Sequence, residues 1–146
     1  MSGLILQIKI SRIDKSLPLP EYQTSGAVAF DMYPRIDAIL KPGEWQLLPS
    51  NFVIEVPSGH ALILAARSSL TKKGLRLSNG IGVIDQDYHG PSDEIGILVY
   101  NFSDRKVKID RGDRIAQGII VPVAKAEWQE IDLTEENSRG GFGSTG

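Results

Sequence analysis

The sequence contains no cysteine and only two histidines, His60 and His89, among its 146 residues. Without thiols the chain forms neither disulfide bonds nor thiolate metal sites, which favours a reducing, cytoplasmic setting. Because the two histidines lie far apart in the sequence, we expect no zinc site. Stability must then come from a hydrophobic core, and the length of the chain suits a single domain.

An excess of charge and a long apolar run are also missing. Sixteen basic and eighteen acidic residues give a net charge of -2, so we expect no nucleic-acid partner, which would require a basic surface. The apolar stretch 1–10 is interrupted by Gln7 and Lys9. No stretch resembles a membrane span or the core of a signal peptide, and we expect a soluble, intracellular protein without a membrane partner.

Apolar residues instead alternate with a period of two in several short segments, a pattern typical of strands. The clearest examples are residues 4–10, 95–99 and 107–109. Clusters of turn-forming residues punctuate the chain at 41–43, 57–59, 101–104 and 110–113. Many short strands with frequent turns predict an all-β fold, either a sandwich or a barrel.

One short helix is expected after the apolar run 61–66, which we interpret as a buried strand. Ser68 or Ser69 can cap the start of this helix, and Gly74 can end it in a left-handed conformation. The helix should be no longer than about two turns.

The periodic pattern stops at Thr134. The remaining composition cannot supply a core, so we expect a β domain over residues 1–133 and a mobile C-terminal arm over residues 134–146. This arm could fold over a ligand, with Phe142 stacked on a base and with Ser144 and Thr145 on phosphate oxygens. The alternative is a frayed end without a function.

The segment 82–90 is the strongest candidate for a reaction site. A short apolar strand leads into a glycine-bounded turn that presents Asp85 and Tyr88, and Asn79 is expected six residues earlier on the same strand. A carboxylate in such a turn can hold a water molecule while the ring forms the wall of a pocket. The alternative is a solvated hairpin turn.

Polar residues elsewhere suggest an anion site. Arg67, Ser68 and Ser69 would combine a guanidinium, hydroxyls and free N–H groups into a phosphate cradle. The alternative is an ordinary serine cap beside a surface arginine. Asp31, in an apolar strand, is either a structural carboxylate or a group that orients water around a phosphate-bound metal.

Taken in order, five segments resemble the trimeric dUTPase family, and together they span nearly the whole chain. These segments are residues 29–32, 66–70, 79–90, 112–117 and 141–146. The third and the fifth segment are the most specific.

The resemblance implies a jelly-roll-like β-barrel or sandwich of the β-clip type, with one short helix and a mobile C-terminal arm. It also implies a homotrimer with active sites between subunits, which hydrolyses dUTP to dUMP and pyrophosphate with Mg²⁺. This reaction would supply dUMP for thymidylate synthesis and keep uracil out of DNA.

In this family pattern Asp85 would orient the water that attacks the α-phosphorus. Tyr88 would lie under the deoxyribose and leave no room for a 2′-hydroxyl. The uracil edge and the sugar would contact residues of the preceding segment, namely Asn79, Gly82, Val83 and Ile84.

The resemblance assigns the phosphates to polar residues outside this turn, namely Arg67, Ser68, Ser69 and, from another subunit, Gln117. Asp31 would contact Mg²⁺ through water, with the ion held mainly by the triphosphate. Phe142 would stack on uracil as the arm closes, and Ser144 and Thr145 would meet phosphate oxygens.

Several features depart from the family pattern. Ala29 and Ser69 stand where the family usually has glycine. The insertion 91–93 lengthens the hairpin and should not move Asp85. Arg139, which the resemblance places on the γ-phosphate, lies three residues before Phe142, where the pattern usually has five.

Two alternative functions remain open at this point. A dCTP deaminase of the same fold would use Arg67, Ser68 and Ser69 on the phosphates, and would need a catalytic glutamate in the pocket. A non-catalytic trimer would bind the nucleotide, or a protein partner in a regulatory role, without turnover.

Overall fold

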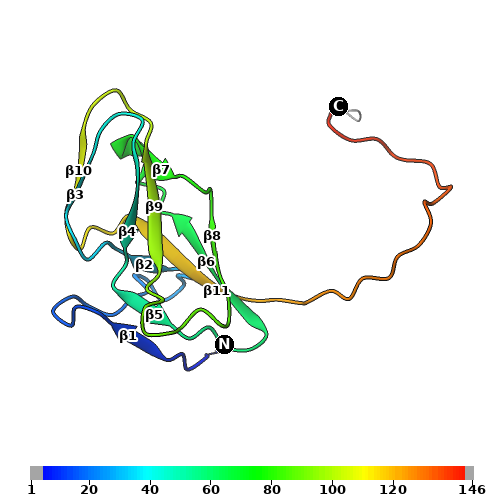
Figure 1. Cartoon of the computed structure of the whole chain (residues 1–146), viewed down its shortest axis with the longest axis horizontal. Helices are drawn as coiled ribbons and strands as arrows, with labels where there is room; N and C mark the ends of the chain where they lie inside the picture. Colours follow the sequence, from blue (N-terminus) through cyan, green and yellow to red (C-terminus); the bar gives the residue numbers. More distant parts are fainter. Residues whose placement is uncertain (1–4, 144–146) are drawn as a thin grey trace.

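The computed structural model describes residues 5–143, and its regular structure is almost entirely β (Figure 1). The only helix among these residues is the 3₁₀ turn η1, Thr71–Lys73. The strands are β1 Ile10–Arg12, β2 Phe30–Met32, β3 Ala38–Leu40, β4 Trp45–Pro49, β5 Phe52–Ile54, β6 His60–Ala66, β7 Leu75–Leu77, β8 Gly82–Ile84, β9 Gly96–Asn101, β10 Val107–Ile109 and β11 Ala116–Pro122. The predicted all-β class is confirmed.

Two antiparallel sheets form the body of the molecule. The larger sheet has the order β2-β11-β6-β8, and the smaller has the order β4-β9-β7. Two further pairs, β1-β5 and β10-β3, extend the structure. In the larger sheet β6 pairs with β11 along its whole length, from His60 opposite Pro122 to Ala66 opposite Ala116.

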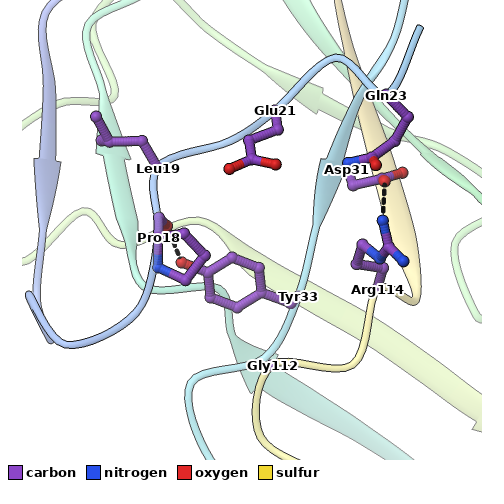
Figure 2. A pocket seen from close by; sticks show the side chains of 8 residues that line it. All are labelled: Pro18, Leu19, Glu21, Gln23, Asp31, Tyr33, Gly112 and Arg114. Carbon is purple, nitrogen blue, oxygen red and sulfur yellow. Dashed lines mark hydrogen bonds and ion pairs between the residues drawn. The ribbon is translucent and has the colours of Figure 1, made fainter.

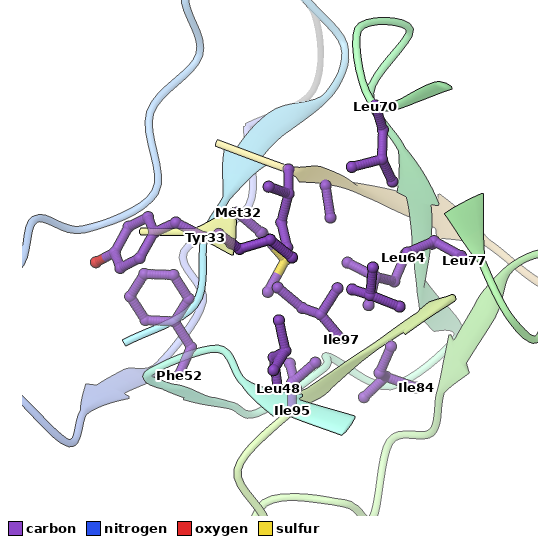
Figure 3. Close-up of a cluster of buried hydrophobic side chains, with 14 of the residues drawn as sticks. Met32, Tyr33, Leu48, Phe52, Leu64, Leu70, Leu77, Ile84, Ile95 and Ile97 are labelled. Atoms are coloured by element: carbon purple, nitrogen blue, oxygen red, sulfur yellow. The ribbon is translucent and has the colours of Figure 1, made fainter. Parts of the chain in front are cut away.

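The core lies between the two sheets, because each central strand turns alternate side chains inward. Leu62 and Leu64 of β6 are buried, as are Ile97 and Val99 of β9. Figure 3 shows these layers meeting around Met32 and Phe52. The alternating apolar residues predicted at 95–99 are therefore the side chains that β9 and the residue before it turn toward the core.

Gly118 of β11 is required by a close approach of neighbouring side chains. A Cβ atom at this position would lie 2.6 Å from Cε2 and Cζ of Phe30 and 3.1 Å from Cδ1 of Leu62. Both neighbours are buried, so neither can move away easily. The glycine allows β2 and β6 to pack their side chains across β11.

The structure corrects three local predictions, namely the serine cap, the strand 4–10 and the position of Asn79. The helix is a single 3₁₀ turn whose N-cap is Leu70 and has no side-chain hydrogen bond, so neither predicted serine caps it. Gly74 does end it in the left-handed conformation, with φ of 79°. In the predicted strand 4–10, β1 begins only at Ile10, and residues 1–4 lie outside the described residues.

Asn79 was predicted to share a strand with Asp85, but it lies in the turn between β7 and β8. The N–H groups of Gly80 and Ile81 bond back to Leu77 and Asn79, at 3.1 and 2.9 Å, and these bonds tighten the chain into a turn. Gly80 has φ of 75°, which ends the strand geometry before β8 begins.

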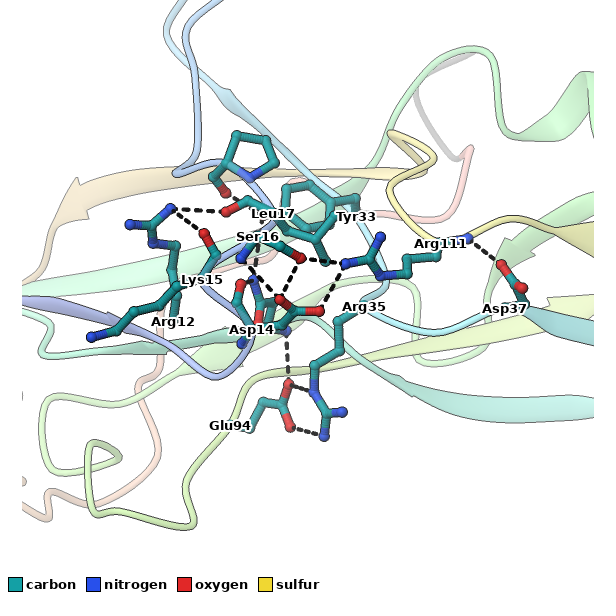
Figure 4. A network of polar contacts seen from close by, with 12 residues as sticks. Arg12, Asp14, Lys15, Ser16, Leu17, Tyr33, Arg35, Asp37, Glu94 and Arg111 are labelled. Atoms are coloured by element: carbon teal, nitrogen blue, oxygen red, sulfur yellow. Dashed lines mark hydrogen bonds and ion pairs between the residues drawn. The ribbon is translucent and has the colours of Figure 1, made fainter.

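A polar network ties distant turns of the body together (Figure 4). Asp14 accepts hydrogen bonds from the N–H and the hydroxyl of Ser16, at 2.9 and 2.6 Å, and pairs with Arg111 at 2.8 Å. These contacts from Ser16 and Arg111 hold the pKa of Asp14 far below its usual range. The side chain of Asn51 bonds to the backbone N–H and carbonyl of Asp14, at 2.6 and 2.9 Å.

The last strand ends at Pro122, and the chain from 124 to 143 is exposed and contains no strand. In Figure 1 this segment leaves the end of β11 and runs away from the body. Its apolar residues Trp128, Ile131 and Leu133 are exposed as well. Within residues 5–143 no helix has the length and apolar character needed to span a membrane.

We predict that Gly118→Ala destabilises the protein by about 1–3 kcal/mol, because the added methyl group overpacks the core. Urea denaturation measures the change in the free energy of unfolding. Gly26→Ala is the control, since a Cβ atom at that position has nothing within 4 Å. Equal stability of the two variants would contradict the packing argument.

Candidate active site

A cleft of about 300 Å³ lies beside β8 and gathers many of the residues predicted for a reaction site. Its lining includes Asn79, Asp85 and Tyr88 from the two ends of this strand. The remaining lining residues are Leu47, Leu64, Gly82, Val83, Ile84, Glu94, Ile95 and Gly96. The apolar base and polar rim of this cleft suit a small, partly polar ligand.

Strand β8 borders the cleft as an edge strand. It pairs with β6 on one side only, through Gly82 opposite Leu64 and Ile84 opposite Leu62. An edge strand presents unpaired N–H and C=O groups on its other side. These main-chain groups can pair with the donors and acceptors of a ligand ring.

The turn that follows β8, residues 85–88, is fixed by several hydrogen bonds. The N–H of Tyr88 bonds to the carbonyl of Asp85 at 3.4 Å, which closes the turn. The side chain of Gln86 accepts a bond from the N–H of Gly59 at 3.2 Å. The hydroxyl of Tyr88 donates to the carbonyl of Glu94 at 3.3 Å. The carboxylate of Asp85 stays exposed on this braced turn.

A second polar group surrounds Asp31 at the other end of the larger sheet. Nε of Arg67 lies 3.1 Å from Oδ1 of Asp31, and Nη1 of Arg114 lies 3.5 Å from Oδ2. Nη1 of Arg67 also donates to the carbonyl of Arg114 at 3.0 Å. Figure 2 shows Asp31 and Arg114 facing each other at the edge of a cavity of about 260 Å³. We call Asp31, Arg67 and Arg114 the arginine cluster.

Gln117 and the two serines lie next to the arginine cluster. Gln117 stands opposite Asp31 in the pairing of β11 with β2, and its Nε2 donates to the carbonyl of Ala66 at 2.9 Å. Ser68 is exposed and Ser69 half-buried in the turn after Arg67, which is closed by a bond of 3.0 Å from the N–H of Leu70 to the carbonyl of Arg67.

The structure does not bring the two groups together within one chain. Ile84 pairs with Leu62, whereas Arg67 follows the last residue of β6. Asp85 and Arg67 are therefore separated by about five residues of extended strand, or roughly 15–20 Å.

The carboxylate of Asp31 is nearly enclosed, with a side chain that is 12% exposed. Its Oδ2 atom is buried and accepts no hydrogen bond, although the guanidinium of Arg114 lies nearby. Among residues 5–143, no three His, Asp or Glu side chains gather closely enough to hold a metal ion. Asp31 is thus a single acidic group beside two cations, which does not make a metal cage by itself.

The residues predicted on the arm lie apart from both groups. Phe142 is fully exposed, with φ of 51°, and Arg139 is also exposed. Ser144 and Thr145 lie outside the described residues.

Two charged residues, one in the cleft and one in the arginine cluster, were not among the predicted site residues. Glu94 lines the cleft, and Arg114 completes the arginine cluster. The acidic residue that follows the insertion 91–93 was a visible signal for Glu94, and the charged turn 111–114 was one for Arg114. Neither sequence signal predicts which residue the side chain of Glu94 or of Arg114 contacts.

Comparison with known proteins supplies the family. A model of the dUTPase family matches residues 15–146. A deoxyuridine 5′-triphosphate nucleotidohydrolase from Methylocella silvestris is 43% identical over 150 residues, which cover 97% of this chain and 92% of that protein.

Solved structures agree with the sequence comparison. The dUTPase from Streptococcus mutans is 29% identical, has a TM-score of 0.74, and covers 82% of this chain and 98% of its own. A mutant of the phage 80alpha dUTPase has a TM-score of 0.84 at 23% identity, with 97% of this chain and 99% of that chain covered. These likenesses confirm the predicted jelly-roll-like fold.

We predict that Asp31→Asn lowers stability by about 1–3 kcal/mol, because it leaves Arg67 and Arg114 close together without the carboxylate that compensates them. Thermal and urea unfolding measure the loss. Asp110→Asn is the control, because it removes only the exposed pair that Asp110 forms with Lys108 at 3.2 Å. A loss no larger than that of the control would show that the arginine cluster contributes nothing to folding.

Proposed function

This chain belongs to the dUTPase family and is a dUTP diphosphatase. We propose that it converts dUTP to dUMP and pyrophosphate by attack of a water molecule that Asp85 orients. One observation carries the proposal. The cleft beside β8 joins the edge of a strand, an exposed carboxylate and an aromatic ring in one place.

The base is read at the start of β8. The amide of Asn79 and the main-chain groups of residues 80–83 offer donors and acceptors that match the polar edge of uracil. A fully paired polar edge rejects a wrong base by about 10⁴-fold or more, because the wrong base leaves buried groups unpaired. Cytosine is rejected in this way, and thymine is rejected by lack of space for its methyl group.

The sugar lies between Ile84 and Tyr88. Ile84 is buried at the base of the cleft, and the ring of Tyr88 stands at its rim. A rigid aromatic ring against the sugar leaves no volume for a 2′-hydroxyl. Deoxyribose is therefore accepted and ribose is excluded.

Asp85 acts on water and forms no covalent bond to the substrate. Its carboxylate accepts a proton from the water as the oxygen attacks the α-phosphorus in line with the leaving pyrophosphate. The braced turn holds the carboxylate in one direction, so that the water is oriented before reaction. Magnesium ion, when bound with the triphosphate, neutralises negative charge on the phosphates.

The arginine cluster and its neighbours bind the phosphates. Arg67 supplies a guanidinium, and Ser68 and Ser69 supply hydroxyls, while Gln117 supports the backbone at Ala66 through its bond of 2.9 Å. Asp31, the one carboxylate of the arginine cluster, would contact Mg²⁺ only indirectly, through water. The metal would then be held mainly by the triphosphate, in keeping with a single protein carboxylate at this place.

Active sites lie between subunits of a homotrimer. The separation of Asp85 from Arg67 along β6 supports this assembly, because two chains can bring together what one chain holds apart.

The outer face of the larger sheet supports the same assembly. Ile63 of β6 stands opposite Ile119 of β11 and Val83 of β8, and all three turn away from the core. Val83 is 59% exposed in the single chain. A continuous apolar face of this kind is typical of a surface that packs against another subunit.

The C-terminal arm, residues 134–146, closes over a completed site. Phe142 stacks on uracil, Arg139 meets the γ-phosphate, and Ser144 and Thr145 meet phosphate oxygens. The full exposure of Phe142 in the free chain supports this role, since a ring without a partner gains contacts when the arm folds over the base. Inside the cell, the reaction supplies dUMP for thymidylate synthesis and keeps uracil out of DNA.

The alternative of a dCTP deaminase is disfavoured by the state of Glu94. Among residues 5–143, Glu94 is the only glutamate that lines the cleft beside β8, and both its oxygens accept hydrogen bonds from Arg35, at 2.7 and 3.0 Å. A carboxylate held in this way is not free to relay protons. Binding without turnover, the other alternative, would appear as tight dUTP binding with no pyrophosphate release.

We predict that Asp85→Asn lowers kcat for dUTP by about 10²- to 10⁴-fold with little change in dUTP binding, because it removes the general base alone. Pyrophosphate release in Mg²⁺ measures kcat, and calorimetry measures binding. Asp87→Asn, which alters the other acid of the same turn, should keep near wild-type turnover. Normal turnover by Asp85→Asn would refute the assigned mechanism, and ammonia release from dCTP would favour the deaminase.

A further inference from the structure

The hydroxyl of Tyr88 ties its ring to the far end of its own loop. The hydroxyl donates to the main-chain carbonyl of Glu94 at 3.3 Å, across the loop that contains the insertion 91–93. Within this loop the N–H of Gly90 bonds to the carboxylate of Asp93 at 2.8 Å, and the N–H of Asp93 bonds to the carbonyl of Gly90 at 3.0 Å. The ring is therefore placed by the far end of its own loop.

The residue after Glu94, Ile95, is fixed to the body through both its N–H and its carbonyl. The N–H of Ile95 bonds to the carbonyl of Phe52 at 2.9 Å, and the N–H of Ser50 bonds to the carbonyl of Ile95 at 3.0 Å. Phe52, Ser50 and Ile95 are all buried. The carbonyl that receives Tyr88 thus sits at the edge of the core.

The side chain of Glu94 fixes the same point through charge. Nε and Nη2 of Arg35 lie 2.7 and 3.0 Å from its two oxygens, and the N–H of Asn51 bonds to Oε2 at 2.8 Å. The Glu94 side chain is only 16% exposed. Charge-assisted bonds of this two-pronged form are the stronger kind and fix direction as well as distance. Figure 4 shows Arg35 and Glu94 in this arrangement.

The partner groups are themselves held rigidly. Asn51 is fully buried and adopts φ of 79°, an uncommon conformation for a residue with a side chain. Its side chain is bonded to the backbone of Asp14 on both its polar atoms, at 2.6 and 2.9 Å. The hydrogen bonds that Arg35 donates to Glu94 raise the pKa of the guanidinium, against the opposing effect of burial.

We propose that the Arg35–Glu94 pair is a positioning device for Tyr88 and thereby sets how strongly the site distinguishes deoxyribose from ribose. The inference rests on the proposed function, in which the ring of Tyr88 excludes the 2′-hydroxyl. The Glu94 carboxylate is occupied by Arg35 and by the N–H of Asn51, and in this proposal the pair does not act on the substrate directly. They act by holding the carbonyl that fixes the ring.

The physical reason lies in the kind of discrimination involved. Exclusion of a hydroxyl by a wall works only while the wall stays in place, and a shift of about 1 Å in a supporting residue is enough to weaken a site. When the pair is broken, the loop end loosens and the ring can give way to the 2′-hydroxyl. The turn that carries Asp85 has its own bonds, so kcat for dUTP is affected less than sugar selection.

The test compares the ratio of kcat/KM for dUTP to that for UTP in wild type, Glu94→Gln, Tyr88→Phe and the double variant. We expect Glu94→Gln and Tyr88→Phe each to lower the ratio by about tenfold, the scale of a loosened steric contact. In the Tyr88→Phe background, Glu94→Gln should cause almost no further loss, because the hydroxyl that it serves is already absent. Arg35→Lys keeps the charge but loses the two-pronged geometry, and should fall between wild type and Glu94→Gln.

Lys108→Met is the matched control, since it breaks an ion pair that is exposed on both sides. It should leave the ratio unchanged. An unchanged ratio in Glu94→Gln would overturn the inference, whatever the loss of thermal stability. Equal losses in the Tyr88 and Tyr88→Phe backgrounds would also overturn it, since the pair would then act independently of the hydroxyl.

The relative affinities for dUMP and UMP, measured by calorimetry on the same variants, report the sugar wall without turnover. A wild-type protein that prefers dUMP but releases no pyrophosphate would refute the proposed function alone. In that case the ratio of dUMP to UMP affinity in Glu94→Gln would still decide the role of the pair. A melting curve that matches wild type would show that the variant is folded.

Discussion

Antiparallel pairing of β6 with β8 and β11 sets the distance between the two polar groups of this chain. The register places Ile84 opposite Leu62 and Ala116 opposite Ala66. The turn with Asp85 is therefore fixed at one end of β6, and Arg67 at the other. A slip by one residue would turn the inward side chains of these strands to the outer face, so the core enforces the register as strictly as the hydrogen bonds do.

The same constraint organises the charges. Asp31 compensates Arg67 and Arg114 in the free chain, and phosphate oxygens would compensate them in a complex. Both guanidiniums already contact the same carboxylate, so a triphosphate bound there as proposed would need little reorganisation of charge. The Asp85 turn is held by main-chain hydrogen bonds and by the bond from Tyr88 to the Glu94 carbonyl, so its carboxylate is left exposed.

The sequence predicts most reliably those features that depend on neighbours along the chain. Gly74 as a left-handed helix end and the alternating strand at 95–99 follow from local geometry, and both are present. The motif around Asp85 and Tyr88 is similarly local. Serine capping was wrong because the 3₁₀ turn begins at Thr71 with Leu70 as its N-cap, and Asn79 was misplaced because Gly80 bends the chain before β8.

Contacts between distant segments could not be predicted from the sequence in the same way. Arg35 and Glu94 are 59 residues apart, and many surface arginines and glutamates of this chain would be equally plausible partners. Arg114 stood in a recognisable turn, but only the pairing of β11 with β2 brings it to Asp31. Such partners are chosen by the topology, which local patterns do not encode.

The central claim is that no single chain holds a complete site, and activity from two inactive chains tests it most directly. Asp85→Asn and Arg67→Ala would each be inactive alone, and co-expression in equal amounts would form mixed assemblies. If Asp85 and Arg67 of one site come from different subunits, random mixing restores about a quarter of the wild-type dUTP turnover. If mixed assemblies form but release no more pyrophosphate than the separate variants, the account of a shared site is wrong.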